Sequence, residues 1–184
     1  MNVQTCTSQR NRGNMKNNVV FIGMPGVGKS TIGVVVAKRL GYHFIDSDIL
    51  IQEQENRLLK EIIAEEGLDG FIEIEGRVNA SIQTERGVIA TGGSVVYHKG
   101  AMEHLKEIGL VVYLKVSYEE LEKRLGDLRE RGVALKDGQT LLDLYKERTI
   151  LYEKYADVIV EEDGKDLDQT IDAVKAAVAG RLAG

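Results

Sequence analysis

The stretch GMPGVGKST, residues 23–31, matches the phosphate-binding loop pattern G-x-x-x-x-G-K-S/T from Gly23 to Ser30 with no mismatch. The residues before it, 18–22, form a short apolar, β-branched run that is typical of a buried parallel strand. After it, apolar residues recur at helical spacing as far as Leu40, and Gly41 offers a stop. A strand, a glycine loop and a helix in that order cradle the phosphate chain of a nucleotide. The sequence therefore predicts that the chain binds a nucleoside triphosphate.

Each residue type in this loop has a physical role. Glycines let the backbone N–H groups turn inward around an anion, and the helix N-terminus adds unpaired N–H groups and the positive end of its dipole. We expect Lys29 to bridge the β- and γ-phosphates of ATP and the Ser30 hydroxyl to ligate Mg²⁺. The predicted nucleotide-binding residues of the loop are Gly26, Val27, Gly28, Lys29, Ser30 and Thr31. The alternative, a glycine-rich turn without a ligand, is disfavoured by the complete motif in this context.

The composition of the chain limits the kinds of molecule that it could bind. The chain has 184 residues, 43% of them hydrophobic and 29% charged, which is ordinary for one globular domain. Its formal net charge of -5 argues against a nucleic-acid binder, because phosphate backbones need a basic face. No apolar run is long enough to span a bilayer, and the single cysteine, Cys6, cannot form an internal disulfide. We expect a cytoplasmic monomer with a small-molecule partner.

Beyond the loop, short apolar runs alternate with amphipathic segments. Residues 1–17 are polar and are expected to be a disordered leader, or to lie upstream of a start at Met15; residues 18–184 form the domain. We expect strands at 18–22, 42–45, 88–91, 110–116 and 158–160. Helices are expected at 31–40, 49–66 with a break near Arg57, 71–84, 99–108, 117–125, 140–155 and 168–182, with a turn at 67–70. This alternation predicts a three-layer α/β/α domain with a parallel sheet and ligands at the carboxyl ends of its strands.

Two further details concern residues 117–139. Ser117 should cap the helix that follows it, with Glu120 completing a capping box. Residues 126–139 have mixed charge and little apolar periodicity, so we expect a mobile loop there.

Polar and glycine residues follow the second and third predicted strands. Asp46 and Asp48 could hold magnesium-bound water or orient a hydroxyl for attack on the γ-phosphate; the alternative is turn chemistry and helix capping. Gly92 and Gly93 would let backbone N–H groups approach a substrate, although a simple turn is a serious rival.

Four arginines lie in or near the expected loop: Arg124, Arg129, Arg131 and Arg148. Individually, each is more often a surface residue than a site residue. A kinase nevertheless needs arginines around the phosphates, where they offset transition-state charge and help to exclude water.

Several linked motifs carry a family resemblance. They are the phosphate-binding loop, Asp46-Ser47-Asp48, Phe71-x-x-x-Glu75, Ala90-Thr91-Gly92-Gly93 and residues 147–152. In order and spacing the chain resembles the shikimate kinase family from about Asn18 to Val160, and more weakly to its end. The resemblance implies a P-loop kinase fold, similar to that of nucleoside monophosphate kinases. Its five-stranded parallel sheet would have the order 2-3-1-4-5, with a helical substrate-binding region at about 46–84 and a lid at about 126–139.

The resemblance also implies roles for individual residues on the nucleotide side. Lys29 and the loop amides would hold ATP, Ser30 would hold Mg²⁺, and Asp46 would support the metal's ligand shell. Arg124 would lie along the adenine, and Arg131 would swing toward the phosphates with the lid.

On the acceptor side, Asp48 would poise the attacking hydroxyl, and Gly93, next to Gly92, would offer its backbone N–H. Glu75 would order the arginines around the acceptor, and Arg148 would grip its carboxylate. The implied reaction transfers the γ-phosphoryl group of MgATP to a hydroxyl, most simply the 3-hydroxyl of shikimate, in aromatic amino acid biosynthesis.

Three positions depart from the family pattern. Ile72 stands where the family has an arginine, one of two that clamp the carboxylate of shikimate, and Ser94 stands where it has a third glycine. The usual Arg-Pro of the lid reads Arg131-Gly132. Losing a charge-assisted contact costs about 1.5–3 kcal/mol, or tenfold to a hundredfold in affinity. Arg77 lies about 500° around a helix from Ile72 and should point elsewhere.

These departures leave two alternatives open. The chain could be a kinase of the same family that acts on a different polyol or hydroxy-amino acid, with Arg148 alone binding any carboxylate. It could also be a non-catalytic ATP-binding regulatory module.

Overall fold

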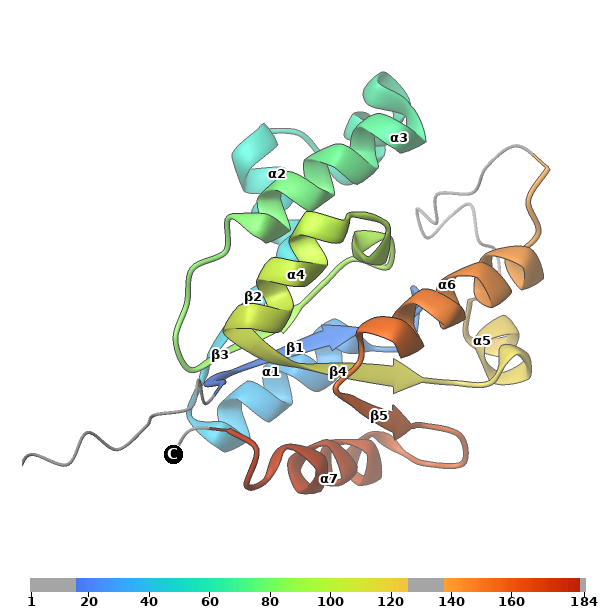
Figure 1. Cartoon of the computed structure of the whole chain (residues 1–184). Helices are drawn as coiled ribbons and strands as arrows, with labels where there is room; N and C mark the ends of the chain where they lie inside the picture. The colour runs from blue at the N-terminus through green and yellow to red at the C-terminus, as the bar shows by residue number, and fades with distance from the viewer. Residues whose placement is uncertain (1–15, 126–137, 183–184) are drawn as a thin grey trace, which may run out of the picture.

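A parallel five-stranded sheet forms the centre of the chain. The computed structural model describes residues 16–125 and 138–182. The strands are β1 Asn18–Ile22, β2 His43–Asp46, β3 Gly87–Ala90, β4 Gly109–Lys115 and β5 Val158–Glu161. They are all parallel and lie in the order β2-β3-β1-β4-β5 (Figure 1), so the predicted fold class and strand order are confirmed.

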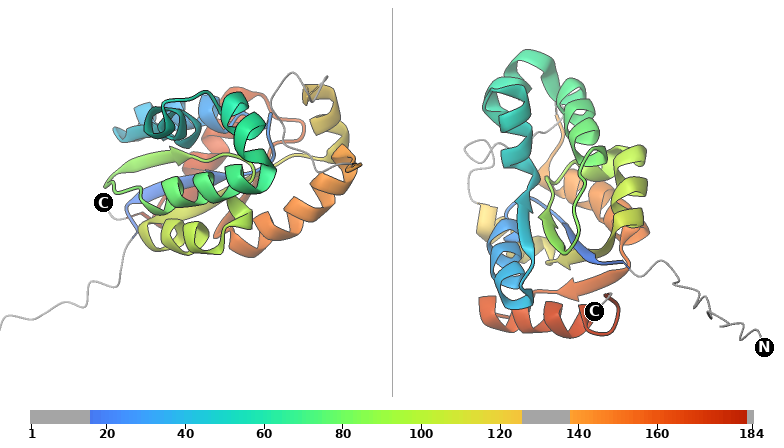
Figure 2. Two further views of the ribbon diagram at one scale, coloured as in Figure 1. Left: turned by 90° about the horizontal axis from the view of Figure 1, so that it is seen from above. Right: turned by 90° about the vertical axis from the view of Figure 1, so that its left-hand side faces the viewer.

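Helices cover both faces of the sheet. They are α1 Lys29–Leu40, α2 Ser47–Glu55, α3 Leu59–Ala80, α4 Lys99–Ile108, α5 Tyr118–Leu125, α6 Leu141–Tyr155 and α7 Leu167–Val178, with a 3₁₀ turn, η1, at Val95–Tyr97. Helices α1 and α7 pack together on one face, and α4 and α6 pack on the other (Figure 1). The α2–α3 pair stands at the opposite end of the molecule from α7 (Figure 2). No helix among the described residues is long and apolar enough to cross a membrane.

The α2–α3 region differs in detail from the prediction. The expected break near Arg57 is confirmed: α2 ends at Glu55, and Asn56 takes a left-handed conformation with φ 52°. The expected turn at 67–70 is wrong, because the backbone departs from the helix only at Gly67, with φ 71° and ψ −177°, and then continues as helix to Ala80. Only a residue without Cβ adopts that backbone conformation readily, so Gly67 alone provides the bend.

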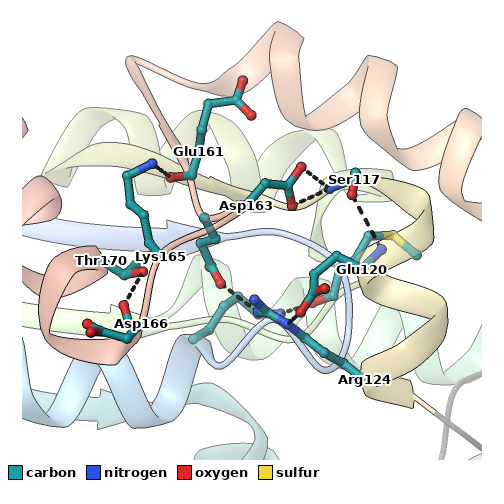
Figure 3. Close-up of polar contacts among 11 residues, drawn as sticks. Ser117, Glu120, Arg124, Glu161, Asp163, Lys165, Asp166 and Thr170 are labelled. Atoms are coloured by element: carbon teal, nitrogen blue, oxygen red, sulfur yellow. Dashed lines mark hydrogen bonds and ion pairs between the residues drawn. The ribbon is translucent and has the colours of Figure 1, made fainter.

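The predicted capping box at Ser117 is half right, as Figure 3 shows. The Ser117 hydroxyl accepts a hydrogen bond from the backbone N–H of Glu120 at 3.3 Å. The Glu120 carboxylate pairs instead with Arg124, and the backbone N–H of Ser117 donates to Asp163 at 3.0 Å. Asp163 follows β5, so a residue distant in the chain takes the second half of the cap.

Asn18 ties the amino ends of the central strands together. It is 1% exposed; its Oδ1 accepts from the backbone N–H of Gly87 at 2.8 Å, and its Nδ2 donates to the carbonyls of Thr84 and Ile108. The next four residues of β1 are fully buried in the core. The strand that leads into the glycine loop is therefore fixed at both faces and at its start.

Replacing Asn18 with alanine should lower the free energy of unfolding by about 2–4 kcal/mol, because one buried and two partly buried backbone groups lose their partner. Chemical denaturation measures this change, with the exposed Lys38→Ala on α1 as the control. A loss below about 1 kcal/mol in Asn18→Ala would show that water replaces the side chain at no great cost.

Candidate active site

The glycine loop is pressed against neighbouring elements. A Cβ atom at Gly23, where φ is +150°, would lie 2.6 Å from the carbonyl oxygen of Leu114, and one at Gly26 would lie 2.6 Å from Leu125. The loop therefore closes onto the end of β4 and onto α5. Helix α1 begins at Lys29 and has no acidic residue in its first turn, so its N-terminal amides suit an anion.

Lys29 is held inside this loop. Its side chain is 8% exposed, and its Nζ donates to the carbonyls of Gly23 at 2.8 Å and Met24 at 2.9 Å. Burial lowers the pKa of Lys29 to about 8, and the negative charge of Asp48 opposes that shift. A phosphate group would stabilise the charged ammonium, which is the arrangement a nucleotide site requires.

One cavity of about 790 Å³ brings most of the predicted site residues together. Those that line it are Gly26, Gly28, Lys29, Ser30, Thr31, Asp48, Glu75, Gly92, Gly93 and Arg148. Val27 is buried in the core and Asp46 is not part of this lining, so Val27 could contribute only its backbone. The predicted site segments therefore meet at the carboxyl ends of the strands.

Asp46 and Asp48 lie at the start of α2 in different surroundings. Asp46 caps the helix, since its Oδ1 accepts from the backbone N–H of Asp48 at 3.0 Å. Asp48 lines the cavity, and burial, together with the charge of Asp46, raises its pKa, while Lys29 lowers it. Between them, the buried Ser47 accepts from the backbone N–H of Gly92 at 3.1 Å, a contact that the sequence analysis missed.

Gly92 and Gly93 form the floor of the cavity. A Cβ at Gly92 would overlap Oε1 of Glu75 and lie 2.9 Å from Oδ1 of Asp48. A Cβ at Gly93 would lie 2.9 Å from Pro25 and 3.0 Å from Nη1 of Arg148. These glycines are therefore needed for close approach of acidic and basic groups, and a turn alone does not account for them.

Arg148 reaches this floor from α6. It is 2% exposed, its Nε donates to the hydroxyl of Tyr97 at 3.3 Å, and its guanidinium lies 5.3 Å from the centre of the Tyr97 ring. The hydroxyl of Tyr152, one turn further along α6, donates to the carbonyl of Gly93 at 2.6 Å. These contacts fix the position of Arg148 relative to Gly93.

Ile72 does not line the main cavity. It borders a smaller space of about 240 Å³ that also contacts Tyr97 and Arg148. Arg77 points away, as expected, and pairs at the surface with Glu55 at 2.6 Å. The described residues thus place one arginine, Arg148, at the main cavity.

Arg124 lies outside the main cavity lining and is paired with two carboxylates. Its Nε donates to Glu120 at 2.9 Å (Figure 3). Its Nη1 donates to Glu162 at 2.7 Å. Glu162 is 3% exposed, and burial raises its pKa while Arg124 lowers it. Glu162 was not among the residues predicted from the sequence. Arg129 and Arg131 lie outside the described residues.

Comparisons with known proteins agree on one family. The family model described as "Shikimate kinase" matches residues 25–179. The chain belongs to the shikimate kinase family. A curated shikimate kinase from Clostridium botulinum strain Alaska E43 is 41% identical over 164 residues, 88% of this chain and 96% of that protein. One from Clostridium beijerinckii is 35% identical over 171 residues, 91% and 98% of the two chains.

Solved structures agree with these sequences. A shikimate kinase from Acinetobacter baumannii in complex with shikimate has a TM-score of 0.79 and 29% identity, covering 92% of this chain and 97% of that one. The enzyme from Aquifex aeolicus has a TM-score of 0.74 and 26% identity, covering 89% and 96%. The predicted family, and with it the class of ATP-dependent small-molecule kinase, is confirmed.

We predict that Gly92→Ala reduces acceptor-dependent turnover at least about 100-fold, because displacing reacting groups by about an ångström has that effect. The added methyl group would overlap Glu75, whereas the nucleotide loop is left intact. Steady-state kinetics measures the loss, and ATP affinity should stay within about threefold. The control is Gly100→Ala, at an exposed position in the first turn of α4. Full activity in Gly92→Ala would contradict the proposed packing of the cavity floor.

Proposed function

We propose that this chain transfers the γ-phosphoryl group of MgATP to a hydroxyl of a small carboxylate-bearing acceptor, most simply the 3-hydroxyl of shikimate. The observation that carries the proposal is that Lys29 and Ser30 line the same cavity as Asp48 and Arg148. Names of relatives support shikimate as the acceptor, and aromatic amino acid biosynthesis as its setting.

The residues on the nucleotide side fit ATP and Mg²⁺. The glycine loop, the open start of α1 and the ammonium of Lys29 suit a phosphate chain. Among the described residues no group of three or more His, Cys, Asp or Glu could hold a metal. Mg²⁺ would be held by Ser30 and by phosphate oxygens, with Asp46 supporting its ligand shell, and it would neutralise charge on the phosphates.

The acceptor would lie on the floor formed by Gly92 and Gly93. Asp48 would accept a hydrogen bond, and then the proton, from the attacking hydroxyl; its raised pKa suits a base of this kind. Gly93 would donate its backbone N–H, and Arg148 would bind the carboxylate. Glu75 would order the polar groups around the acceptor from below this floor.

The remaining roles concern the adenine base of ATP and the predicted lid. Arg124, held by Glu120 and Glu162, would lie along the adenine. Arg131 would approach the phosphates with a lid at about 126–139, and the acceptor region would span about 46–84. Lys16, the first described residue, pairs with Asp157 of the domain at 2.7 Å, and the rest of the predicted leader, residues 1–15, lies outside the described residues. The protein would act as a cytoplasmic monomer.

A second candidate keeps the kinase chemistry and changes the acceptor. Ile72 leaves Arg148 as the arginine at the cavity, so a polyol or hydroxy-amino acid that needs one arginine would also fit. Acceptor screening by ADP release separates the two candidates. Tight ATP binding without stimulation by any acceptor would instead favour the regulatory module.

We predict that Asp48→Asn lowers kcat with shikimate by about 10²–10⁴-fold, because asparagine cannot take the proton. ATP affinity should remain nearly unchanged. A coupled assay of ADP release at saturating MgATP measures turnover in this variant and in a control. The control is Asp168→Asn, which alters an exposed ion pair with Arg39. Turnover near the native value in Asp48→Asn would overturn the assigned role.

A further inference from the structure

One departure from the family pattern, Ser94, contacts a single buried side chain, that of Glu75. Ile72 lies three residues before Glu75 on α3, and residues at that spacing are neighbours on a helix surface. Ser94 comes from the loop after β3, and its hydroxyl lies 2.5 Å from Oε2 of Glu75. The hydroxyl of Ser94 therefore contacts the Glu75 carboxyl group, whereas Ile72 borders the smaller space beside Tyr97 and Arg148.

The carboxyl group of Glu75 is fully buried. Its side chain is 0% exposed, and Oε1 has no hydrogen-bond partner among the described residues. The same oxygen lies so close to Gly92 that a Cβ atom at that position would overlap it. A buried carboxylate with one hydrogen bond is costly to ionise.

Charged and titratable groups face Glu75 from three other elements: Asp48 from α2, Lys29 from α1, and Arg148 and Tyr152 from α6. Burial raises the pKa of Glu75 to about 7, and Asp48 adds to the increase. The hydrogen bond from Ser94 and the charges of Arg148 and Lys29 act in the opposite direction. Both protonation states of Glu75 are therefore accessible near neutral pH.

We propose that Ser94 is a positioning residue for Glu75, the buried carboxyl group at the acceptor end of the site. Its hydroxyl holds the Glu75 carboxyl beneath the acceptor floor, so that acceptor binding depends on whether Glu75 carries a proton. This inference rests on the proposed function, because it concerns a carboxylate-bearing acceptor bound by Arg148.

The sign of the effect follows from the charges. Below pH 7 Glu75 is neutral, and Arg148 attracts the acceptor carboxylate unopposed. Above pH 7 the ionised Glu75 competes for Arg148 and repels the acceptor. Removing the Ser94 hydroxyl takes away a bond to the charged form and raises the pKa of Glu75, whereas an arginine at position 72 lowers it.

Calorimetric titration of shikimate at saturating MgADP, from pH 6 to 8.5, measures this dependence. The nucleotide keeps Lys29 charged, which removes its own titration from the profile. The native dissociation constant should rise about tenfold across the range, which corresponds to a coupling of about one pKa unit. In Glu75→Gln the rise should be at most about twofold, because the group whose titration causes it has been removed.

Two further variants separate positioning from packing. In Ser94→Ala the rise should begin about one pH unit higher than in the native protein. In Ile72→Arg binding should be tighter and nearly independent of pH, because the added cation keeps Glu75 ionised and supplies a second donor to the carboxylate. Ser81→Ala, which removes a hydroxyl that donates to the carbonyl of Val78, should match the native profile.

A measurement without acceptor keeps the test independent of activity. In ¹³C NMR of glutamate carboxyl carbons, with Glu75→Gln giving the assignment, Glu75 should titrate near pH 7 in native protein and higher in Ser94→Ala. Titration at an ordinary glutamate value, or the same midpoint in both proteins, would overturn the inference. A midpoint near 7 that moves in Ser94→Ala, with no binding of shikimate at any pH, would support the Ser94–Glu75 pair and contradict shikimate as the acceptor.

Discussion

The close approach of chain segments at Gly92 and Gly93 is the constraint on which the site depends. The glycine loop, α3 and α6 converge there, and a single methyl group at Gly92 would overlap the carboxyl of Glu75. The hydroxyls of Ser47 and Tyr152 hold this segment from two sides, one through the amide of Gly92 and the other through the carbonyl of Gly93. The sheet order supports the arrangement, because β3 lies between β1, which leads into the loop, and β2, which leads to Asp48.

The same convergence concentrates charge. Lys29, Asp48, Glu75 and Arg148 line one cavity, and three of them are at least nine-tenths buried. Buried ionisable groups lower stability unless they are paired, so their presence here indicates a functional requirement. The lowered pKa of Lys29 and the raised pKa of Glu75 have one physical cause, which is loss of water around a charged form. A bound phosphate would stabilise the charged form of Lys29, and a bound proton removes the charge of Glu75.

The sequence predicted those parts of the protein that local patterns specify. The phosphate-binding loop, the five strands and the break after α2 each depend on a few consecutive residues, and the structure has them where they were expected. Features that depend on distant residues were missed or wrong. Asp163 completes the cap of α5, Glu162 binds Arg124, and Ser94 contacts Glu75, and none of these pairs has a spacing that a sequence pattern reveals. The turn predicted at 67–70 was wrong for a different reason: a single glycine, Gly67, bends the helix without ending it.

Phosphorus NMR of a reaction containing the protein, MgATP and shikimate tests the central claim most directly. The account predicts that the γ-phosphate signal disappears as a phosphomonoester coupled to the C3 proton of shikimate appears, with little free phosphate. Such a product requires that donor and acceptor occupy one water-excluding cavity. Release of inorganic phosphate without an ester, or no reaction while ATP is bound, would contradict the claim that the two halves of this cavity form one phosphoryl-transfer site for shikimate.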